Sequence, residues 1–379
     1  MEAILQSCSV RHLSEGEVLI APGQENHYLY LLISGRLQVC LDTADSQTGI
    51  PVEPGNCIGE MSIIDGGLTS AYVVAEKHCS LLLLPDSVFW EEFMPIPGAA
   101  RNLMQVLTNR MRKDNQLMLD NLAQQLRFEH LQKELATAGK IQANILPQEI
   151  PLFPNHPQLD VCAVLEPASE VGGDFYDAFA LDPEHVCLAV GDVSGKGMPA
   201  ALFMVRVVTL LRMSIAKDRS FDAVLPEINR ILCENNADCM FVTLFVGVLN
   251  VTSGRFVYVN GGHNPPLFAR RNMPFAPLPM PKGMLLGVFE QARYPVAELT
   301  FQPGDAIVMY TDGVTEAENT QKAVFSEARA AQVLSAVAPP RETTHLVKSL
   351  EEAIRHFSKG QPQSDDITIL ALRFLPPPA

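Results

Sequence analysis

The sequence has few features of a secreted, membrane-bound or zinc-binding protein. It contains no run of roughly 18 apolar residues, no basic start followed by an apolar stretch, and no two cysteines at zinc-site spacing. The eight cysteines are scattered, mostly within apolar runs, which favours reduced and buried thiols. We therefore expect a cytoplasmic protein without a membrane segment.

Positive charge is also scarce. Only 28 Lys and Arg residues stand against 43 Asp and Glu residues, which gives a net charge of −15 at pH 7. Non-specific affinity for DNA or RNA comes mainly from clustered cations that neutralise phosphates. The composition therefore argues against a nucleic acid as partner.

The length of 379 residues suggests two domains or slightly more, at roughly 150 residues per domain. The charge changes sign along the chain. Residues 1–100 carry 13 acidic and three basic side chains, residues 101–150 carry five and seven, and the remainder carries 25 and 18. This pattern predicts a separate middle segment between two acidic domains. We place an N-terminal regulatory domain at 1–100, a helical linker at 101–147 and a C-terminal domain at 148–375.

The first segment alternates short apolar runs with turn signals. GEVLI, YLYLLISG and AYVVAEKHCSLLLLP are separated by clusters of Gly, Pro and Asn. Strands of this length, joined by such turns, are typical of an antiparallel barrel or jelly roll.

The middle segment has the pattern of one long helix. After residue 100 it contains no Gly before Gly139 and no Pro before Pro147, and apolar residues recur every seven positions with Gln124 as a polar interruption that can fix register. We predict a parallel coiled coil in a homodimer; the alternative is an amphipathic helix packed on its neighbours. The seam consists of Leu117, Gln124, Leu131, Ala138 and Ile145, with Phe128 and Leu135 beside it.

The third segment mixes apolar strands such as HVCLAVGDVS, FVTLFVGVLN and DAIVMYTDG with helical stretches such as MPAALFMVRVVTLLRMSIA. Strands and long helices in this arrangement indicate an α+β sandwich, in which helices cover two packed β-sheets.

Aspartates stand at the ends of these strands. They are Asp174 in EVGGDFYD, Asp192 in VGDVSGKG, Asp312 in YTDGVTE, and Asp365 with Asp366 in QSDDITIL. A single Asp before Gly is usually only a turn residue. Carboxylates from several strands, however, are what two divalent cations about 4 Å apart require, since no single loop surrounds both. Neighbouring glycines would let the backbone approach such ions.

Residues 140–374 resemble the SpoIIE-like, bacterial branch of the metal-dependent PPM protein serine/threonine phosphatases, which includes regulators of sporulation and stress-response sigma factors. After KIQANILP, the matching motifs EVGGDFYD, VGDVSGKGMPAAL, MFVTLFVGVLN, VNGGHNPPLF, YTDGVTEAEN and SDDITILAL follow in the family's order. The resemblance implies a binuclear Mn²⁺ or Mg²⁺ site whose bridging water attacks the phosphorus in line. It implies catalytic and metal-binding roles for Asp174, Asp192, Asp312 and Asp365, with further metal contacts from the carbonyl of Val193 and from Asp366.

One departure concerns the phosphate. Eukaryotic members of the superfamily use an Arg upstream of the first Asp, whereas here no Arg or Lys lies between Lys140 and Lys196. Phosphate binding would then depend on the metals and on the DVSGKG turn, with Lys196 either a ligand of the phosphate or a solvated loop residue. His263, in NGGHNPP, is a candidate general acid, but a hydrogen-bonding turn residue is the more common role.

Residues 8–95 resemble a cyclic-nucleotide-binding domain of the catabolite-activator type. The resemblance rests on LSEGEVLIAPGQENHYLYLLISGRLQV and CIGEMSIIDGGLTSAYVVA. It implies that Glu60 binds the ribose hydroxyl of a ligand, but Thr69 stands where the family has the Arg that pairs with the cyclic phosphate. Losing a charge-assisted pair costs a hundredfold or more in affinity. A cyclic nucleotide is therefore disfavoured, and a different ligand or a barrel kept for dimerisation are the other interpretations.

Together these features predict a homodimeric, metal-dependent protein serine/threonine phosphatase. Its implied substrate is a phosphorylated regulator of the anti-sigma-factor antagonist (STAS) type, and the N-terminal domain would control its activity through the linker helix. The alternative is a non-catalytic dimeric scaffold that uses a phosphatase-like fold to capture a protein. Retention of all the carboxylate clusters favours the enzyme.

Overall fold

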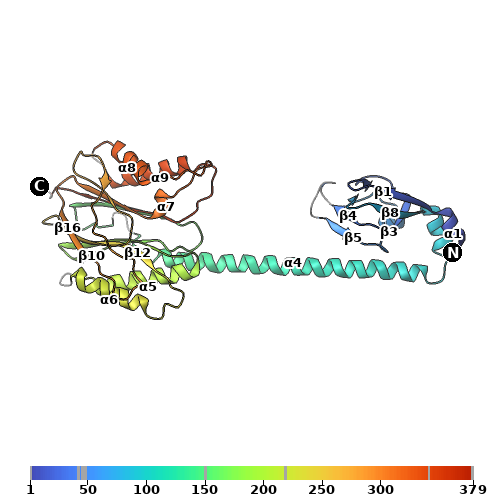
Figure 1. Cartoon of the computed structure of the whole chain (residues 1–379), viewed down its shortest axis with the longest axis horizontal. Helices are drawn as coiled ribbons and strands as arrows, with labels where there is room; N and C mark the ends of the chain where they lie inside the picture. The colour runs from blue at the N-terminus through green and yellow to red at the C-terminus, as the bar shows by residue number, and fades with distance from the viewer. Residues whose placement is uncertain are drawn as a thin grey trace. The chain divides into compact units, whose positions relative to one another are not determined.

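The computed structural model describes residues 2–40, 43, 49–148, 152–216, 220–339 and 342–376. The chain divides into two compact units, residues 1–124 and 125–379. Helix α4(Ala99–Ala143) passes from one unit into the other (Figure 1).

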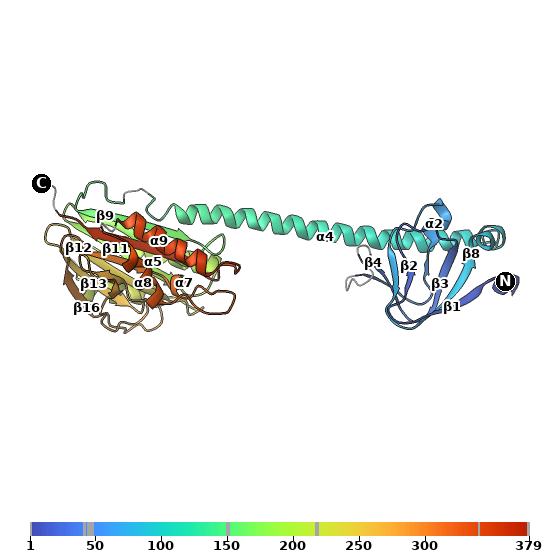
Figure 2. The ribbon, with the colours of Figure 1, turned by 90° about the horizontal axis from the view of Figure 1, so that it is seen from above.

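The first unit is a β-barrel of the jelly-roll kind. Its strands form two antiparallel four-stranded sheets, seen from above in Figure 2, in the orders β1-β8-β3-β6 and β2-β7-β4-β5. Leu32, Leu37 and Leu81 are fully buried between them. The elements are α1(Glu2–Ser7), β1(Ser9–Leu13), β2(Val18–Ile20), β3(Tyr28–Ser34), β4(Leu37–Cys40), β5(Ile50–Val52), β6(Cys57–Ile58), α2(Glu60–Asp65), β7(Tyr72–Ala75), β8(Cys79–Pro85), α3(Asp86–Val88) and the π-helical turn η1(Phe89–Phe93).

Helix α4 runs for 45 residues without a break. No proline interrupts it, and its single late glycine, Gly139, lies near the end. Large apolar side chains of the predicted seam, including Leu117, Phe128 and Leu131, are exposed along the helix. An apolar surface of this kind is unusual on a helix without a partner.

The second unit consists of two antiparallel five-stranded sheets with helices on their outer faces (Figure 1). The sheets have the strand orders β10-β11-β12-β13-β16 and β15-β14-β17-β18-β9. The elements are β9(Leu159–Glu166), β10(Phe175–Asp182), β11(His185–Val193), α5(Met198–Ser214), α6(Phe221–Cys233), β12(Val242–Asn250), β13(Arg255–Gly261), β14(Leu267–Ala269), β15(Ala276–Pro277), β16(Val296–Thr300), β17(Ala306–Tyr310), α7(Asp312–Thr315), α8(Glu327–Ala336), α9(Thr343–Phe357) and β18(Ile367–Phe374).

Two apolar cores hold this sandwich together. The larger lies between the sheets and beneath α5 and α6, and it includes the fully buried Val190, Phe245 and Leu370. The smaller lies between the second sheet and α8 and α9. The structure therefore confirms the predicted fold class, a β-barrel and a helical linker followed by an α+β sandwich. In the part of the chain that the structure describes, no helix combines the length and apolarity needed to cross a bilayer.

Candidate functional site

The two sheets of the second unit each contribute aspartates to one place. Asp174 immediately precedes β10, and Asp192 is the last residue but one of β11, in the first sheet. Asp312 begins α7 directly after β17, and Asp366 directly precedes β18, in the second sheet. The strand ends predicted from the apolar runs are thus where these carboxylates lie.

A threonine links the two sheets at this point. The Thr368 hydroxyl donates a hydrogen bond to Asp174 Oδ2 at 2.8 Å. The backbone N–H of Thr368 donates to the Thr311 hydroxyl at 3.0 Å, and the N–H of Thr311 donates to the Thr368 carbonyl at 3.1 Å. Because Thr311 precedes Asp312, these bonds hold the Asp174 and Asp312 segments together.

Burial and mutual repulsion dominate the electrostatics. Burial, and then the charges of Asp312 and Asp365, raise the pKa of Asp192 from its ordinary value near 4 to about 7. Burial and the neighbouring Asp192 raise the pKa of Asp174 well above its ordinary range. Burial, Glu316 and Asp365 raise the pKa of Asp312. Several carboxylates are therefore held near one another at an electrostatic cost.

The last pair of aspartates is engaged by the protein itself. Asp366 accepts hydrogen bonds from the backbone N–H groups of Ala168 at 2.7 Å and Gly173 at 3.1 Å. Asp365 Oδ2 lies 3.2 Å from Lys196 Nζ, which also donates to the Ser364 carbonyl at 2.6 Å. Among the described residues, no three Asp, Glu, His or Cys side chains are grouped to hold one ion as they stand. Asp365 and Asp366 would have to turn from these partners to join a common site.

The backbone closes tightly around the carboxylates. A Cβ on Gly172 would lie 2.1 Å from Asp366 Oδ2, and one on Gly173 would lie 2.6 Å from the Val193 carbonyl oxygen. At Gly173 the close atom belongs to the backbone, so only glycine fits there, whereas a side chain at Gly172 would displace the Asp366 carboxylate. A cavity of about 160 Å³, lined by Asp192, Asp365, Asp366 and the turn that contains Lys196, opens beside them.

The donor set suits hard divalent cations. Carboxylate and carbonyl oxygens are the ligands that Mg²⁺ and Mn²⁺ prefer. Among the described residues, no cationic side chain forms an ion pair with Asp174, Asp192 or Asp312, whose pKa values are raised. Lys196 pairs with Asp365 instead and is mostly exposed. A bound cation would relieve this repulsion. The residues present therefore fit such ions.

His263 joins strand β12, the neighbour of the strand that carries Asp192, to the end of β17, which precedes Asp312. Its Nδ1 lies 2.8 Å from the Thr243 hydroxyl, and Thr243 is the β12 partner of Asp192. Its Nε2 lies 3.1 Å from the Tyr310 carbonyl oxygen, two residues before Asp312. Burial lowers the pKa of His263 to about 4, so the ring is neutral at pH 7. The structure thus supports the hydrogen-bonding role over that of a general acid.

The last turn of α4 contacts the loop in front of Asp174, which the sequence analysis missed. Gln142 Nε2 donates to the Gly172 carbonyl at 2.6 Å, and the Gly172 N–H donates to Gln142 Oε1 at 3.2 Å. A Cβ on Gly139 would lie 2.0 Å from the Glu170 carbonyl oxygen. A glycine inside an otherwise strong helical pattern was the available signal of this close approach.

In the first unit, the predicted ligand-binding Glu60 has an internal partner. Arg110 of α4 donates from Nη1 to Glu60 Oε1 at 2.5 Å and from Nη2 to the Cys57 carbonyl at 2.8 Å. The Glu60 side chain is 3% exposed and that of Arg110 is 37% exposed. The pair is 50 residues apart in sequence, and no local pattern predicts it.

Thr69 is also engaged within the barrel. Its hydroxyl donates to the Ala21 carbonyl at 2.6 Å and accepts from the Gln24 N–H at 3.0 Å. The backbone of Thr69 bonds to Gly23 and Gln24 as well. Both positions that contact a nucleotide in the related domains are therefore occupied by the protein's own groups.

Comparisons with known families agree with this geometry. The profile described as stage II sporulation protein E (SpoIIE) matches residues 182–375, and that of the cyclic nucleotide-binding domain matches residues 10–94.

Individual relatives match over about two thirds of this chain. Protein IcfG of Synechocystis sp. is 31% identical over 267 residues, which are 63% of this chain and 41% of IcfG. Phosphoserine phosphatase RsbU of Bacillus subtilis is 28% identical over 246 residues, which are 65% of this chain and 71% of RsbU. The match thus spans about two fifths of IcfG but most of RsbU. The SiaA-PP2C domain of Pseudomonas aeruginosa has the same fold, with a TM-score of 0.57 at 21% identity over 65% of this chain and 98% of that domain.

Proposed function

Because the chain belongs to the family of stage II sporulation protein E (SpoIIE), we propose that it is a metal-dependent phosphatase that hydrolyses phosphoserine or phosphothreonine in a protein. RsbU, which matches over most of its length, bears the name phosphoserine phosphatase. The observation that carries the proposal is the convergence of Asp174, Asp192 and Asp312 from two sheets, with pKa values raised by burial and by neighbouring acidic groups. Repulsion between neighbouring carboxylates is unfavourable in a purely structural role, whereas a site that binds cations needs such carboxylates close together.

The ions would be two Mn²⁺ or Mg²⁺. Their proposed ligands are Asp174, Asp192, the carbonyl of Val193, Asp312, Asp365 and Asp366. When bound, such ions supply an activated water and stabilise the phosphoryl oxygens.

The chain's own groups would position the phosphate and keep the site in register. Gly195 and Gly197 have φ angles of +84° and +73°, and a Cβ at either would meet nothing within 4 Å, so this turn is open to an approaching phosphate. Backbone N–H groups in such a turn bind anions well. Lys196 pairs with Asp365 through a side chain that is 64% exposed, and this side chain would turn to bind the phosphate. The neutral His263 would hold the two sheets in register rather than transfer a proton.

We propose a phosphorylated STAS-type regulator as the substrate, because the family resemblance implies it. The cytoplasm is the expected location, in line with eight cysteines that are scattered along the sequence, mostly within apolar runs. The scaffold alternative predicts capture of the same protein without turnover.

Control would pass through α4. Gln142 holds the loop before Asp174 from one end of this helix, and Arg110 is held by Glu60 nearer the other end. Exposed apolar residues along the helix support a parallel dimer. Changing Gln142 to Glu replaces the donor to the Gly172 carbonyl by a carboxylate oxygen that this carbonyl repels, which would displace the loop before Asp174. We therefore expect the Mn²⁺ concentration for half-maximal activity to rise about tenfold. Gln132→Glu, on the same helix but exposed, is the control.

The barrel would hold its helix without a cyclic nucleotide. Arg110 on Glu60 and the hydrogen bonds of Thr69 support this. Isothermal titration with cyclic AMP and cyclic GMP should give no heat of binding at millimolar concentrations. Micromolar binding would overturn this part of the proposal.

The activity is tested with p-nitrophenyl phosphate and a serine-phosphorylated STAS-domain protein. Phosphate release should require Mn²⁺ or Mg²⁺ and should disappear in Asp192→Asn. The control is Asp222→Asn, the same substitution at an exposed position of α6, which should stay active. Binding of the phosphoprotein without turnover of either substrate would favour the scaffold.

A further inference from the structure

Five large apolar side chains are exposed around the turn that follows Asp192. We call them the apolar rim. The exposed fraction reaches 63% for Leu202 and 58% for Phe289. The rim consists of Met198 and Leu202 on α5, and Met284, Val288 and Phe289 in the loop between β15 and β16.

The loop that carries Val288 and Phe289 is firmly held. Asn229 of α6 is fully buried, and its Nδ2 donates to the Phe289 carbonyl at 2.8 Å, while its Oδ1 accepts from the Gly287 N–H at 2.8 Å. Asn236 Nδ2 donates to the Gly287 carbonyl at 2.9 Å. Because the buried Asn229 and the partly buried Asn236 both hydrogen-bond the loop backbone, the exposed apolar side chains are presented by a well-held loop.

Strand pairing places this loop close to the carboxylates. Val242 of β12 pairs with Val193 on one side and forms a bridge with Leu286 on the other. Leu286 therefore lies two strand spacings, or about 10 Å, from Val193. Ser194, next along the turn, exchanges hydrogen bonds with Phe241 at 2.9 Å, which ties the turn to the same strand.

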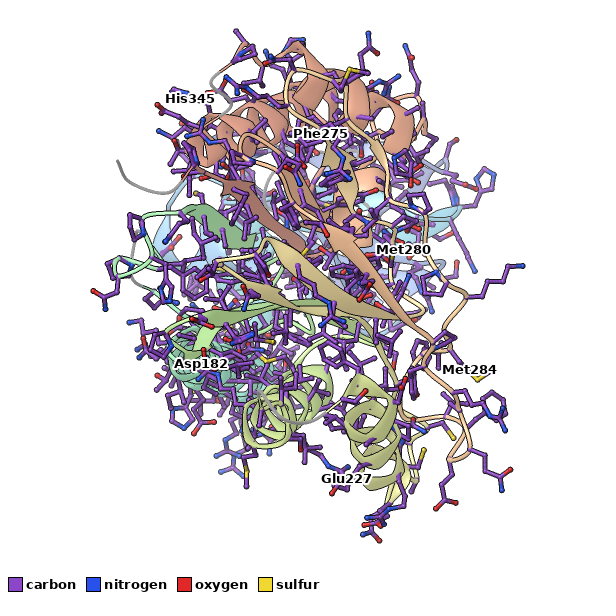
Figure 3. All side chains as sticks on the ribbon, turned by 90° about the vertical axis from the view of Figure 1, so that its left-hand side faces the viewer. Asp182, Glu227, Phe275, Met280, Met284 and His345 are labelled. Carbon is purple, nitrogen blue, oxygen red and sulfur yellow. The ribbon has the colours of Figure 1, made fainter. Side chains whose placement is uncertain are left out.

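The loop also adjoins α5. Gly287 has a φ of +100°, and a Cβ there would lie 3.5 Å from the ring of Phe203 and 2.8 Å from the Met240 carbonyl oxygen. Phe203 is the neighbour of the exposed Leu202, so the two parts of the rim are close together. Figure 3 shows Met284 at the outside of the domain, in the same loop.

We propose that the apolar rim is the docking surface for the folded phosphoprotein substrate; this rests on the proposed function. A phosphoserine side chain is short, so a folded protein that brings one to the carboxylates must cover the surface within about 10 Å of them. An apolar surface at this place gains from that contact because burial removes it from water. The metal site recognises the phosphate, and the rim recognises the protein that bears it.

The test compares three substrates of increasing size: p-nitrophenyl phosphate, a ten-residue phosphoserine peptide and the whole serine-phosphorylated STAS-domain protein. In the double variant Leu202→Ser/Phe289→Ser, kcat/KM for the whole protein should fall about 30- to 100-fold, mainly through KM. Turnover of p-nitrophenyl phosphate should change less than twofold. Met273→Ser removes an equally exposed side chain outside the rim and is the control.

A second measurement does not depend on turnover or on a change in the rim itself. Cys239 is exposed and directly precedes Met240. The carbonyl of Met240 packs against Gly287, so Cys239 lies next to the loop that carries part of the rim. The phosphoprotein should slow alkylation of Cys239 by a maleimide in the native chain, with Cys239→Ser identifying the labelled residue.

The outcomes separate the two proposals. Unchanged phosphoprotein kinetics, or an equal loss with p-nitrophenyl phosphate, would overturn the docking surface. If Cys239 becomes protected as the enzyme concentration rises, without any phosphoprotein, the rim contacts a second copy of this chain. That result would also overturn the docking surface. If wild type turns over neither substrate, the proposed function fails, while protection by the phosphoprotein would still support the rim.

Discussion

Buried carboxylates have opposite surroundings in the two units of this chain. In the first unit, Glu60 is almost fully buried and is paired with the guanidinium of Arg110. In the second unit, Asp174, Asp192 and Asp312 face one another, and their pKa values are raised. A paired carboxylate is satisfied within the protein, whereas repelling carboxylates gain from a cation that comes from outside. The difference separates a carboxylate that holds structure from those that we propose bind cations.

The same contrast exists within the second unit. Asp305 is buried like Asp174, yet it accepts a hydrogen bond from Arg270 at 2.6 Å and others from the backbone of Gln302 and Arg271. Asp177 is likewise paired with Arg212. Burial of an aspartate alone therefore does not mark the candidate site; among the described residues, what marks it is that Asp174, Asp192 and Asp312 form no ion pair with a cationic side chain.

The strongest test of the contrast removes one carboxylate from each class. Asp312→Asn should lower kcat/KM on p-nitrophenyl phosphate by roughly 10³-fold, because it would delete a proposed ligand of ions that stabilise the transition state. Asp305→Asn should leave kcat/KM within about threefold and lower the free energy of unfolding instead. The two rates and two denaturation curves, measured in Mn²⁺, check this. Equal activity losses in both variants would remove the distinction.

The next largest effect concerns the paired carboxylate. Arg110→Met leaves Glu60 buried without its cation. We expect the free energy of unfolding of the first unit to fall by about 2–3 kcal/mol. This is less than for a fully buried pair, because the Arg110 side chain is partly exposed. Urea denaturation, followed by the fluorescence of Trp90, checks it. Arg112→Met, an exposed change two residues along the same helix, is the control.

A double variant sharpens this result. Glu60→Gln/Arg110→Met removes both charges, so it should recover part of the loss seen in Arg110→Met. A double variant less stable than the sum of the single changes would contradict the ion-pair interpretation.

These predictions differ in how much of them the sequence alone supplies. The positions of Asp174, Asp192 and Asp312 follow from apolar runs that end in acidic residues, because a strand's end is visible locally. The pairing of Glu60 with Arg110 is not visible locally, since it joins the first residue of α2 to a residue of α4 that is 50 positions away and depends on how α4 packs.

Other contacts were also beyond the sequence. The hydrogen bonds of Gln142 to Gly172 depend on the approach of α4 to a loop 30 residues further along the chain. His263 lies in a turn motif, and only the packing of the two sheets reveals that it joins Thr243 to the Tyr310 carbonyl. The fold class was predictable because period and turn chemistry are local properties, whereas the partners of polar side chains are set by tertiary packing.

The pH dependence of stability tests the repelling carboxylates directly. Because the pKa of Asp192 is raised to about 7 in the folded chain, the folded state keeps a proton that the unfolded state has released between about pH 4 and 7. The free energy of unfolding of the metal-free protein should therefore fall as the pH rises through this range. From pH 5 to pH 8 we expect this group to contribute a loss of about 1–2 kcal/mol, discounted because it is partly accessible to water.

Asp192→Asn identifies the group responsible. The variant cannot ionise at this position, so its stability in EDTA should vary less between pH 5 and pH 8 than that of the wild type. An unchanged slope would mean that other groups cause the dependence.

The smallest expected effect concerns Lys196, a cation that lies beside the cluster. Lys196 and Asp365 form an ion pair with side chains 64% and 47% exposed, and pairs this exposed contribute at most about 0.5 kcal/mol. Lys196→Met should leave the melting temperature within about 1–2 °C of wild type, as should Lys322→Met, which breaks the exposed pair with Glu318. If Lys196 also binds the phosphate, only its variant should raise KM for p-nitrophenyl phosphate. A large loss of stability in Lys196→Met would instead mean that Asp365, like Glu60, is a structural carboxylate that the protein neutralises with its own cation.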